Sequence, residues 1–422
     1  MHLRIEVVYS LADQVTVSVT NLAIGLFFVH YATKHDYALY SIAFGLISLG
    51  IGIGNALIYT PMLVTAIAED GTLRERHCKA MLIAQLIIFG SVVSIIGSTM
   101  AFLYSFVAEN SEMAIFSLAI AVASFAALFQ EFLRRYNFMA AKPAVVFGID
   151  LVFAICVISI LFLLWYQEYQ EMFLHAVLAY AAAAFIAGGV GLARSGLIQR
   201  LQRNDIRNAL RSAWQNGCWS LGGVTITWIQ SQCYAYFLVI LGAATALAEA
   251  NAARLLLSPI SPLSTGVMNV MTPRLARHKA QGNMQGLFLH ANQMMKLIMG
   301  LLIAYVALVY LSKDIFIQLV LTGDYRDSGM YLLAWSLVLI AQTARTNTSV
   351  LLQVFREFRP LMIANAWSAL VVLVFTYIFI LYLGPVGSIL ALGCGELTLT
   401  TSLWYALRQV KRTLAQRAHV LG

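Results

Sequence analysis

The stretch AVVFGIDLVFAICVISILFLLWY, residues 144–166, is apolar at nearly every position and carries a single charge, Asp150. The hydrocarbon core of a bilayer, about 30 Å thick, is crossed by roughly 20 residues of α-helix. The stretch therefore predicts a membrane-spanning helix. Its hydrophobicity is continuous rather than alternating, which excludes a strand of a membrane β-barrel.

Eleven further stretches have the same character, so the sequence predicts twelve membrane-spanning helices. In the first half these spans cover residues 7–30, 37–64, 80–105, 113–133, 144–166 and 173–193. In the second half they cover residues 214–241, 247–272, 292–312, 329–354, 361–383 and 386–407. The expected fold class is an all-α polytopic membrane protein.

Composition agrees with this class. Hydrophobic residues make up 60% of the chain, charged residues only 11%, and the mean hydropathy is +0.79, which leaves too little polar surface for a soluble globule. The net charge of +8 is spread over many short segments and forms no single basic face, so no nucleic-acid partner is expected.

The distribution of charge predicts the topology. Of the 27 Lys and Arg residues, 21 lie in the two termini and the loops after even-numbered spans, whereas the opposite loops hold only Lys34, Lys313 and Arg326. By the positive-inside rule both termini are expected in the cytoplasm. The first span carries Asp13, Gln14 and Asn21 and is too long for the apolar core of a signal peptide, so we expect it to remain in the mature protein.

The chain divides into two sets of six spans. Residues 1–196 form the predicted N-terminal lobe, residues 197–213 an amphipathic linker helix at the cytoplasmic headgroups, and residues 214–422 the C-terminal lobe. Thr60-Pro61 and Lys142-Pro143 recur as Thr272-Pro273 and Arg359-Pro360, which indicates parallel repeats related by a pseudo-two-fold axis along the membrane normal. Chance placement of the prolines is the alternative.

Three spans carry polar stripes at helical spacing. The stripe of the first span is Ser10, Asp13, Gln14, Ser18 and Asn21; that of the seventh is Asn216, Ser220, Gly223, Thr227, Gln230, Ser231 and Tyr234; that of the tenth is Gln342, Arg345, Ser349 and Gln353. Long stripes favour helices that line a hydrated cavity. The alternative is hydrogen bonding between packed helices.

Charges inside the spans are costly and therefore informative. The guanidinium groups of Arg254 and Arg345 present planar sets of donors suited to phosphate oxygens, so both are candidates for contacting an anionic headgroup, with Gln342, Asn216 and Gln230 as polar neighbours. The alternative is internal pairing, of Arg345 with Glu396 and of Arg254 with Glu249.

The N-terminal half is expected to bury Asp13 and Asp150 without a cation. With Asn21 they are candidates for a proton or sodium site, because desolvated carboxylates take up protons readily. A structural, hydrogen-bonded role is at least as plausible. Glu131 lies three and four residues before Arg134 and Arg135, a spacing typical of local ion pairs at a helix end.

The sequence offers no enzyme signature. The five cysteines are isolated, so we expect neither disulfides nor a metal site, and no nucleotide-binding loop or catalytic triad is recognisable. The longest external segment, residues 312–328, is too short for the catalytic loop expected of a glycan polymerase or ligase. Glycine-rich stretches at Gly45–Gly54 and Gly188–Gly191 fit close helix packing.

Three segments carry a family resemblance: SLADQVTVSVTNLAIGLFF (Ser10–Phe28), DYALYSIAFG (Asp36–Gly45) and QEFLRRYNF (Gln130–Phe138). They resemble O-antigen and exopolysaccharide repeat-unit flippases, the Wzx-like members of the multidrug/oligosaccharidyl-lipid/polysaccharide exporter superfamily. The resemblance implies two lobes that alternate between inward-open and outward-open states. Its implied substrate is an undecaprenyl-pyrophosphate-linked oligosaccharide, moved from the inner to the outer leaflet of the bacterial inner membrane.

The resemblance also implies a cationic cavity, to which Arg254 and Arg345 would contribute, and cooperation with a glycan polymerase and glycosyltransferases. No cofactor is expected apart from proton or sodium coupling. Lipid II flippases of the superfamily typically have fourteen spans, which disfavours that substrate for a chain of twelve. A cation-coupled multidrug antiporter is the leading alternative, because Asp13 and Asp150 resemble acidic cation sites. A non-transporting membrane scaffold is the second.

Overall fold

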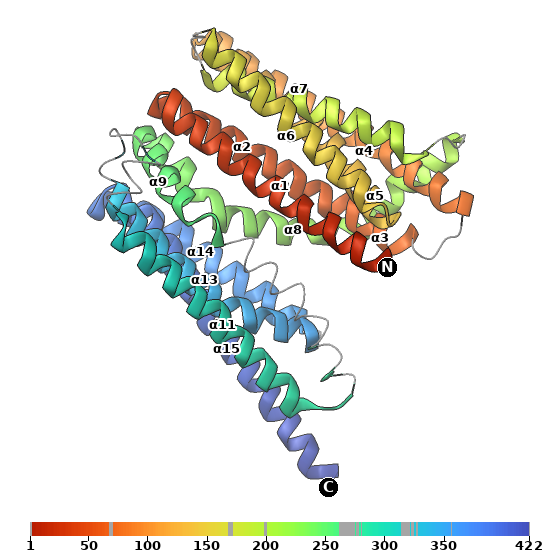
Figure 1. The fold of residues 1–422 in the computed structure, drawn as a ribbon, viewed down its shortest axis with the longest axis vertical. Coiled ribbons are helices and arrows are strands. Elements are labelled where there is room, and N and C mark those ends of the chain that lie inside the picture. Colours follow the sequence, from red (N-terminus) through yellow and green to blue (C-terminus); the bar gives the residue numbers. More distant parts are fainter. Residues whose placement is uncertain are drawn as a thin grey trace. The chain divides into compact units, whose positions relative to one another are not determined.

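The computed structural model describes residues 2–66, 71–167, 172–197, 201–260, 275, 278–279, 281–313, 321, 325, 328–355 and 357–421. All regular elements within these ranges are helices, and they form two compact units, Met1–Thr225 and Ile226–Gly422. Within each unit the long helices lie side by side (Figure 1). The all-α class expected from the sequence is confirmed.

The first unit contains seven α-helices, two π-helical turns and the start of an eighth α-helix. They are α1 (His2–Tyr31), α2 (Lys34–Gly54), η1 (Asn55–Tyr59), α3 (Thr60–Ala66), α4 (Gly71–Phe102), η2 (Leu103–Val107), α5 (Ser111–Met139), α6 (Pro143–Tyr166), α7 (Met172–Ser195) and α8 (Arg203–Ile240). Helix α5 is central, because it packs against α2, α4, α6 and α7.

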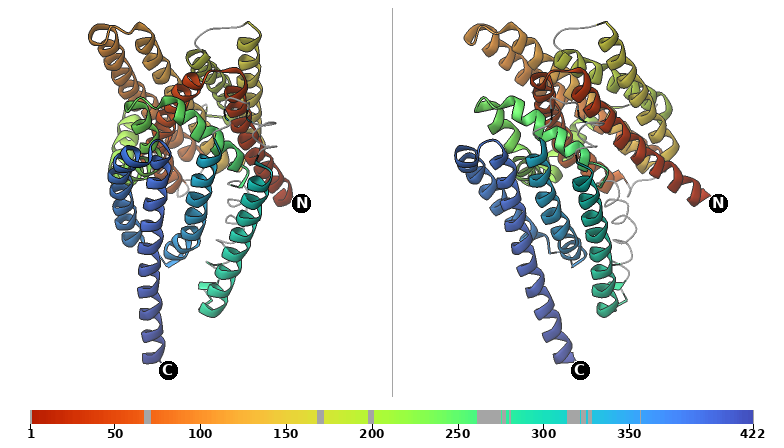
Figure 2. Two further views of the ribbon diagram at one scale, coloured as in Figure 1. Left: turned by 90° about the vertical axis from the view of Figure 1, so that its left-hand side faces the viewer. Right: turned by 60° about the vertical axis from the view of Figure 1, so that its left-hand side comes forward.

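The second unit begins within α8. It continues with α9 (Ala244–Leu257), α11 (Met284–Leu311), α13 (Gly329–Phe355), α14 (Phe358–Leu383) and α15 (Val386–Leu421). Helix α15 packs along both α13 and α14. Its C-terminal end extends past the other helices of the unit (Figure 2).

The predicted spans coincide with helices. Among the described residues, nine helical segments are long and apolar enough to cross a membrane, which supports a multi-pass membrane protein. The other three predicted spans fall on α8, α9 and α13. The polar stripes of α8 and α13 lower the hydropathy of these helices. The predicted span that contains α9 covers residues 247–272, and its part from residue 261 onward lies outside the described residues.

The linker is not a separate helix. Helix α8 starts at Arg203 and runs without a break through the predicted seventh span to Ile240. Its first turns pack on the first unit, because Ala209 and Ala213 are buried in the same apolar cluster as Leu133. Arg200 lies outside the described residues, as does Thr272-Pro273 of the predicted repeat.

An ion pair joins the start of α8 to α4. Arg76 Nε donates to Asp205 Oδ2 over 2.7 Å, and the backbone N–H of Gln202 donates to the same oxygen over 2.8 Å. These two hydrogen bonds, first that of Gln202 and then that of Arg76, lower the pKa of the Asp205 carboxyl below its usual value. The pair therefore remains charged at neutral pH.

A single carbonyl oxygen connects three segments of the first unit. The hydroxyl of Tyr59, at the end of η1, donates to the Leu128 carbonyl of α5 over 3.1 Å, and Gln85 Nε2 of α4 donates to the same oxygen over 2.7 Å. Tyr59 and Gln85 are both almost fully buried. The π-helical turn, which rotates the following residues relative to an α-helix, brings Tyr59 to this position.

Glycines allow close helix packing, as the sequence predicted. A Cβ at Gly188 would lie 2.6 Å from the Phe129 ring, and one at Gly191 would lie 2.7 Å from Ile149. At Gly217 of α8 the neighbour is backbone, since a Cβ there would lie 2.6 Å from the Ala56 carbonyl oxygen and 2.7 Å from Leu57 Cα. Backbone atoms cannot move aside as a side chain can.

We therefore expect Gly217→Ala to destabilise the protein by about 1–3 kcal/mol through overpacking. Gly222→Ala, five residues further along α8, is the matched control, because a Cβ there meets no described atom within 4 Å. This control should raise stability slightly through helix propensity. Thermal denaturation of purified protein measures both, and equal midpoints for the two variants would contradict the close contact.

Candidate functional site

An ion cluster lies inside the first unit, around Arg134 of α5. Its guanidinium contacts three carboxylates: Nε lies 2.8 Å from Asp150 Oδ1, one terminal nitrogen 2.6 Å from Glu131 Oε2, and the other 3.5 Å from Asp13 Oδ2. Arg135 Nε lies 2.7 Å from the second oxygen of Glu131. The local pairs predicted for Glu131 are thus confirmed.

The expectation that Asp13 and Asp150 lack a cation is wrong. The sequence predicts only local pairing of Arg134 with Glu131 at a helix end, but its side chain also contacts Asp13 and Asp150 and is only 19% exposed. Asp150 lies seven residues into α6, about 10 Å from its start at 1.5 Å per residue. Arg134 lies five residues, or about 7.5 Å, before the end of α5, so the two residues are at similar distances from the connection between α5 and α6.

The cluster carries more negative than positive charge. Asp13, Glu131 and Asp150 together offer three negative charges, against the two positive charges of Arg134 and Arg135. Asp13 is fully buried, and its Oδ1 has no hydrogen-bond partner in the described residues. One negative charge therefore remains uncompensated when all three carboxylates are ionised, which is unfavourable in a buried site.

The polar stripe of α1 divides between two environments. Asp13 points into the ion cluster, whereas Gln14 and Asn21 are exposed on the helix surface. The side chain of Ser10 is outside the described residues. The structure therefore does not bring Asn21 together with Asp13 and Asp150 as one site.

A second ion pair lies within the second unit. Arg345 Nε of α13 lies 2.6 Å from Glu396 Oε2 of α15, and Gln342 Nε2 donates to Glu396 Oε1 over 3.1 Å. Glu396 is nearly buried, but the Arg345 side chain is 30% exposed. The contacts of Arg345 in the described residues use one of its five N–H donors. Pairing therefore leaves the guanidinium able to bind an anion.

Arg254 stacks on an aromatic ring. Its guanidinium carbon lies 4.8 Å from the centroid of Trp335 on α13, and Trp335 Nε1 donates to the Ala250 carbonyl of α9 over 2.9 Å. The Arg254 side chain is exposed. A cation held over an indole face keeps its charge and its outward N–H donors.

Arg254 and Arg345 are associated with different positions along α13. Trp335, which contacts Arg254, lies ten residues before Arg345, or about 15 Å along the helix axis. A pyrophosphate is too short to bridge this distance. Arg254 and Arg345 thus contact or occupy positions on α13 that are about three helical turns apart.

The remaining predicted residues differ in role. Gln230 is buried, and its Nε2 donates over 2.7 Å to Ser368 of α14, which in turn donates over 2.7 Å to the Gly395 carbonyl of α15. This is hydrogen bonding between packed helices. The side chain of Asn216 lies outside the described residues, whereas Ser220, Thr227 and Ser231 keep an exposed polar face on α8.

Solved structures with the same fold are transporters. The chain is similar to "Lipid II flippase MurJ, inward closed conformation", with a TM-score of 0.76 and 14% identity over 95% of this chain and 87% of that one. It is also similar to a MOP superfamily transporter from Pyrococcus furiosus, with a TM-score of 0.67 and 15% identity over 97% and 95% of the two chains.

A multidrug resistance MATE family transporter in its outward-facing conformation gives a TM-score of 0.64 at 15% identity, over 97% of this chain and 95% of that one. No family model and no curated protein matches the sequence. The chain therefore has the fold of MOP superfamily transporters, as the resemblance implied, whereas the Wzx-like subgroup rests on the sequence segments alone.

Removing the positive charge of Arg134 from the ion cluster should strongly destabilise the folded protein. Arg134→Gln leaves the buried carboxylates without their shared partner, and breaking a buried pair costs about 3–5 kcal/mol. We expect folded protein to be largely lost from membranes. Adding Asp150→Asn to Arg134→Gln should restore part of it, and size-exclusion profiles and melting midpoints measure both variants. A double variant no more stable than the single one would contradict this charge balance.

Proposed function

We propose that this protein is a flippase that moves undecaprenyl-pyrophosphate-linked oligosaccharide repeat units from the cytoplasmic to the outer leaflet of the bacterial inner membrane by alternating access. The observation that carries the proposal is the likeness to the lipid II flippase, with a TM-score of 0.76 over 95% of the chain. The MATE structures give TM-scores between 0.58 and 0.66.

The arginines supply the chemistry for such a headgroup. An amphipathic lipid needs shielding only for its polar head, and guanidinium groups bind phosphate oxygens through paired N–H donors. With both termini cytoplasmic, α13 runs from the outer to the inner side, so Arg345 lies in the inner half and Arg254 in the outer half. The pyrophosphate would meet Arg345 first and Arg254 later. Arg345 is paired with one carboxylate, that of Glu396, and Arg254 is stacked on Trp335.

We propose further that the cluster of Asp13, Glu131, Asp150 and Arg134 couples transport to an ion gradient. Its uncompensated negative charge favours uptake of one cation. A proton suits the geometry better than sodium, because Arg134 already occupies the position between the carboxylates. The partnerless Oδ1 of Asp13 is the atom on which we place that proton.

The second candidate is a cation-coupled multidrug antiporter. MATE transporters share the fold, and a proton site of this kind would serve drug export equally well. A non-transporting scaffold would use the same ion pairs only for stability. Glycan and drug-sensitivity phenotypes together separate the three functions.

The deciding experiment compares cells that lack the protein with the same cells carrying a complementing copy. Lipid-linked repeat units should accumulate and surface glycan should disappear in the deletion strain, and the copy should reverse both. Extracted lipid-linked oligosaccharides and surface polysaccharide are quantified side by side. A normal glycan with altered drug sensitivity would favour the antiporter, and a normal result for both would favour the scaffold.

Arg345 variants test the first cationic position. Charge-assisted hydrogen bonds contribute about 1.5–3 kcal/mol, so Arg345→Gln should reduce transport by about tenfold to a hundredfold. Arg345→Lys keeps the charge but loses the planar donors, and we expect partial transport. Glu396→Gln is the matched control, because it removes the ion pair but retains the arginine. Equal loss of transport in Glu396→Gln and Arg345→Gln, at equal protein levels, would assign Arg345 to structure.

Coupling is tested at Asp13. In membrane vesicles, transport by the unaltered protein should rise with an imposed proton gradient and fall with a protonophore. Asp13→Asn mimics the protonated carboxyl and should make transport insensitive to both. Glu112→Gln, in the first turn of α5 and outside the ion cluster, is the control and should respond as the unaltered protein does. A response to sodium replacement, with none to the protonophore, would instead identify sodium as the ion.

A further inference from the structure

Arg254 of α9 is supported by residues from two other helices of the second unit. Its guanidinium stacks over the Trp335 ring of α13, and it faces the hydroxyl of Tyr234 on α8 as a hydrogen-bond donor. The Tyr234 and Trp335 rings meet edge to face, with centroids 5.5 Å apart, and both side chains are buried. The exposed guanidinium therefore lies on a fixed aromatic support.

The Tyr234 hydroxyl connects Arg254 to Asn251. It donates to Asn251 Oδ1 over 2.9 Å. A guanidinium only donates, so the hydroxyl oxygen accepts from Arg254 and its single hydrogen goes to Asn251. The opposite orientation of the Asn251 amide would leave that hydroxyl hydrogen without an acceptor among the three groups, which is unfavourable for a buried side chain. The hydrogen bonds therefore run in one direction, from Arg254 through Tyr234 to Asn251.

This direction determines which groups remain for a ligand. With Oδ1 bound to Tyr234, the amide nitrogen of Asn251 keeps two N–H donors. Asn251 is half-buried and lies three residues before the exposed Arg254, on the same face of α9. The unused N–H groups of Arg254 and the amide of Asn251 therefore form a set of side-chain donors without a side-chain acceptor.

A set of donors selects its ligand by charge and by hydrogen-bonding character. The oxygens of an ionised phosphate or pyrophosphate only accept hydrogen bonds, and their negative charge complements a guanidinium. A sugar hydroxyl both donates and accepts, so the donors would leave its hydrogen unpaired. The contacts of Arg254 in the described residues include no carboxylate that would compete with an anion. Phosphate oxygens are therefore the chemical class that this position fits.

We propose that Arg254 and Asn251 form a binding site for phosphate oxygens and that Tyr234 is its positioning residue. The proposal rests on the flippase function, for which it adds Asn251 as a direct contact of the headgroup. Tyr234 touches no ligand and acts through its two neighbours, by holding the guanidinium and by turning the Asn251 amide outward. A lipid-borne pyrophosphate and the free anion share this chemistry.

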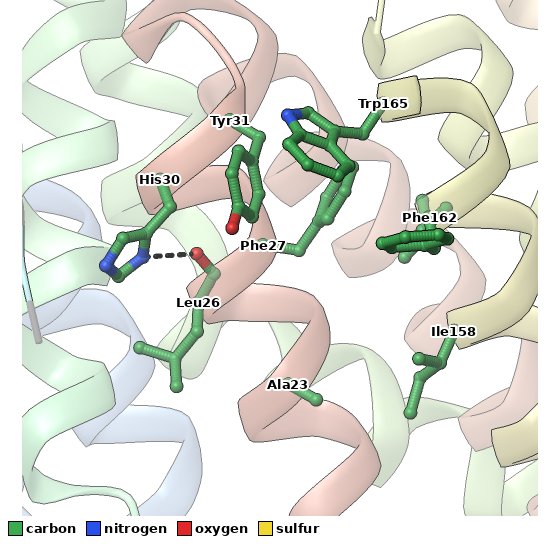
Figure 3. Close-up of a pocket in the computed structure, with 9 residues that line it drawn as sticks. Ala23, Leu26, Phe27, His30, Tyr31, Ile158, Phe162 and Trp165 are labelled. Atoms are coloured by element: carbon green, nitrogen blue, oxygen red, sulfur yellow. Dashed lines mark hydrogen bonds between the residues drawn. The ribbon is translucent and has the colours of Figure 1, made fainter. Parts of the chain in front are cut away.

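A pocket of the first unit, between α1 and α6, has a different character (Figure 3). Its volume is about 400 Å³, and its lining is aliphatic and aromatic except for His30, whose Nδ1 lies 2.9 Å from the Leu26 carbonyl oxygen. The residues that line it include no Lys, Arg, Asp or Glu. This pocket therefore offers a phosphate no fixed counter-charge, in contrast to the position at Arg254.

Native mass spectrometry of the purified full chain tests the site, with undecaprenyl pyrophosphate as the probe and undecaprenol as the phosphate-free comparison. Asn251→Asp keeps the oxygen that binds Tyr234 but replaces the two N–H donors with a negative acceptor, so binding of the pyrophosphate should fall by about tenfold or more. Tyr234→Phe keeps the ring against Trp335 and should lower this binding by about tenfold. Neither variant should change the binding of undecaprenol.

Two further variants separate positioning from general stability. Tyr305 of α11 donates to the Leu256 carbonyl of α9 over 2.7 Å, so Tyr305→Phe removes a hydroxyl from the same helix but not from the site, and it should bind as the unaltered protein does. In an Asn251→Ala background, Tyr234→Phe should cost only about twofold, because one of the two groups that Tyr234 positions is already gone.

Undiminished binding of undecaprenyl pyrophosphate to Asn251→Asp would overturn the proposal, as would a parallel loss of undecaprenol or fully additive losses in the double variant. Displacement of the probe by inorganic pyrophosphate would show that the free anion suffices as ligand, and its failure, with the variant losses retained, that the lipid-borne form is needed. Variant losses together with a normal glycan in the deletion strain would reject the flippase function alone. Undiminished binding together with accumulated lipid-linked units would reject this site alone.

Discussion

A charge inside a membrane-spanning bundle is costly unless another charge is paired with it, and ion pairs join helices within both units of the protein. Leaving a charge unpaired at membrane depth costs several kilocalories per mole. In the first unit Arg134 meets carboxylates from α1, α5 and α6. In the second unit Arg345 meets Glu396 between α13 and α15. Ion pairs between these helices therefore stabilise the units in addition to apolar packing.

The charge balances of the two units differ. The first cluster has three carboxylates against two arginines, which is the basis of the proton site proposed above. The second is a one-to-one pair whose arginine is partly exposed and keeps unused N–H donors, which is the basis of the proposed anion contact. Arg254 adds a second cation held over Trp335. A proton site in one unit and an anion site in the other, as proposed above, would suit a transporter that uses a gradient to move a phosphate-bearing lipid.

The sequence predicted the positions of those helices whose length is set by the thickness of the bilayer. The helices from α1 to α7, and α11, α14 and α15, lie where continuous apolar runs predicted them. The continuity of α8 was not predicted, because its charged first turns look like a surface helix until they pack on the first unit. The partners of Arg134 were missed because its contact with Asp13 joins residues 121 positions apart, which no local spacing encodes. Gln230 was expected to line a cavity, but it donates a hydrogen bond to Ser368. A polar stripe in the sequence is the same for a helix face that lines water and for one that hydrogen-bonds to a neighbouring helix.

The Leu128 carbonyl, which accepts from both Tyr59 and Gln85, fixes three helical segments in depth as well as in contact. Apolar ridges permit neighbouring helices to slide along one another at little cost, but a buried polar bond in hydrocarbon does not, since no water replaces the lost partner. These bonds hold α4 and α5 in register within the first unit. In the proposed transport cycle, the unit would therefore tilt as one piece rather than change by sliding of its helices.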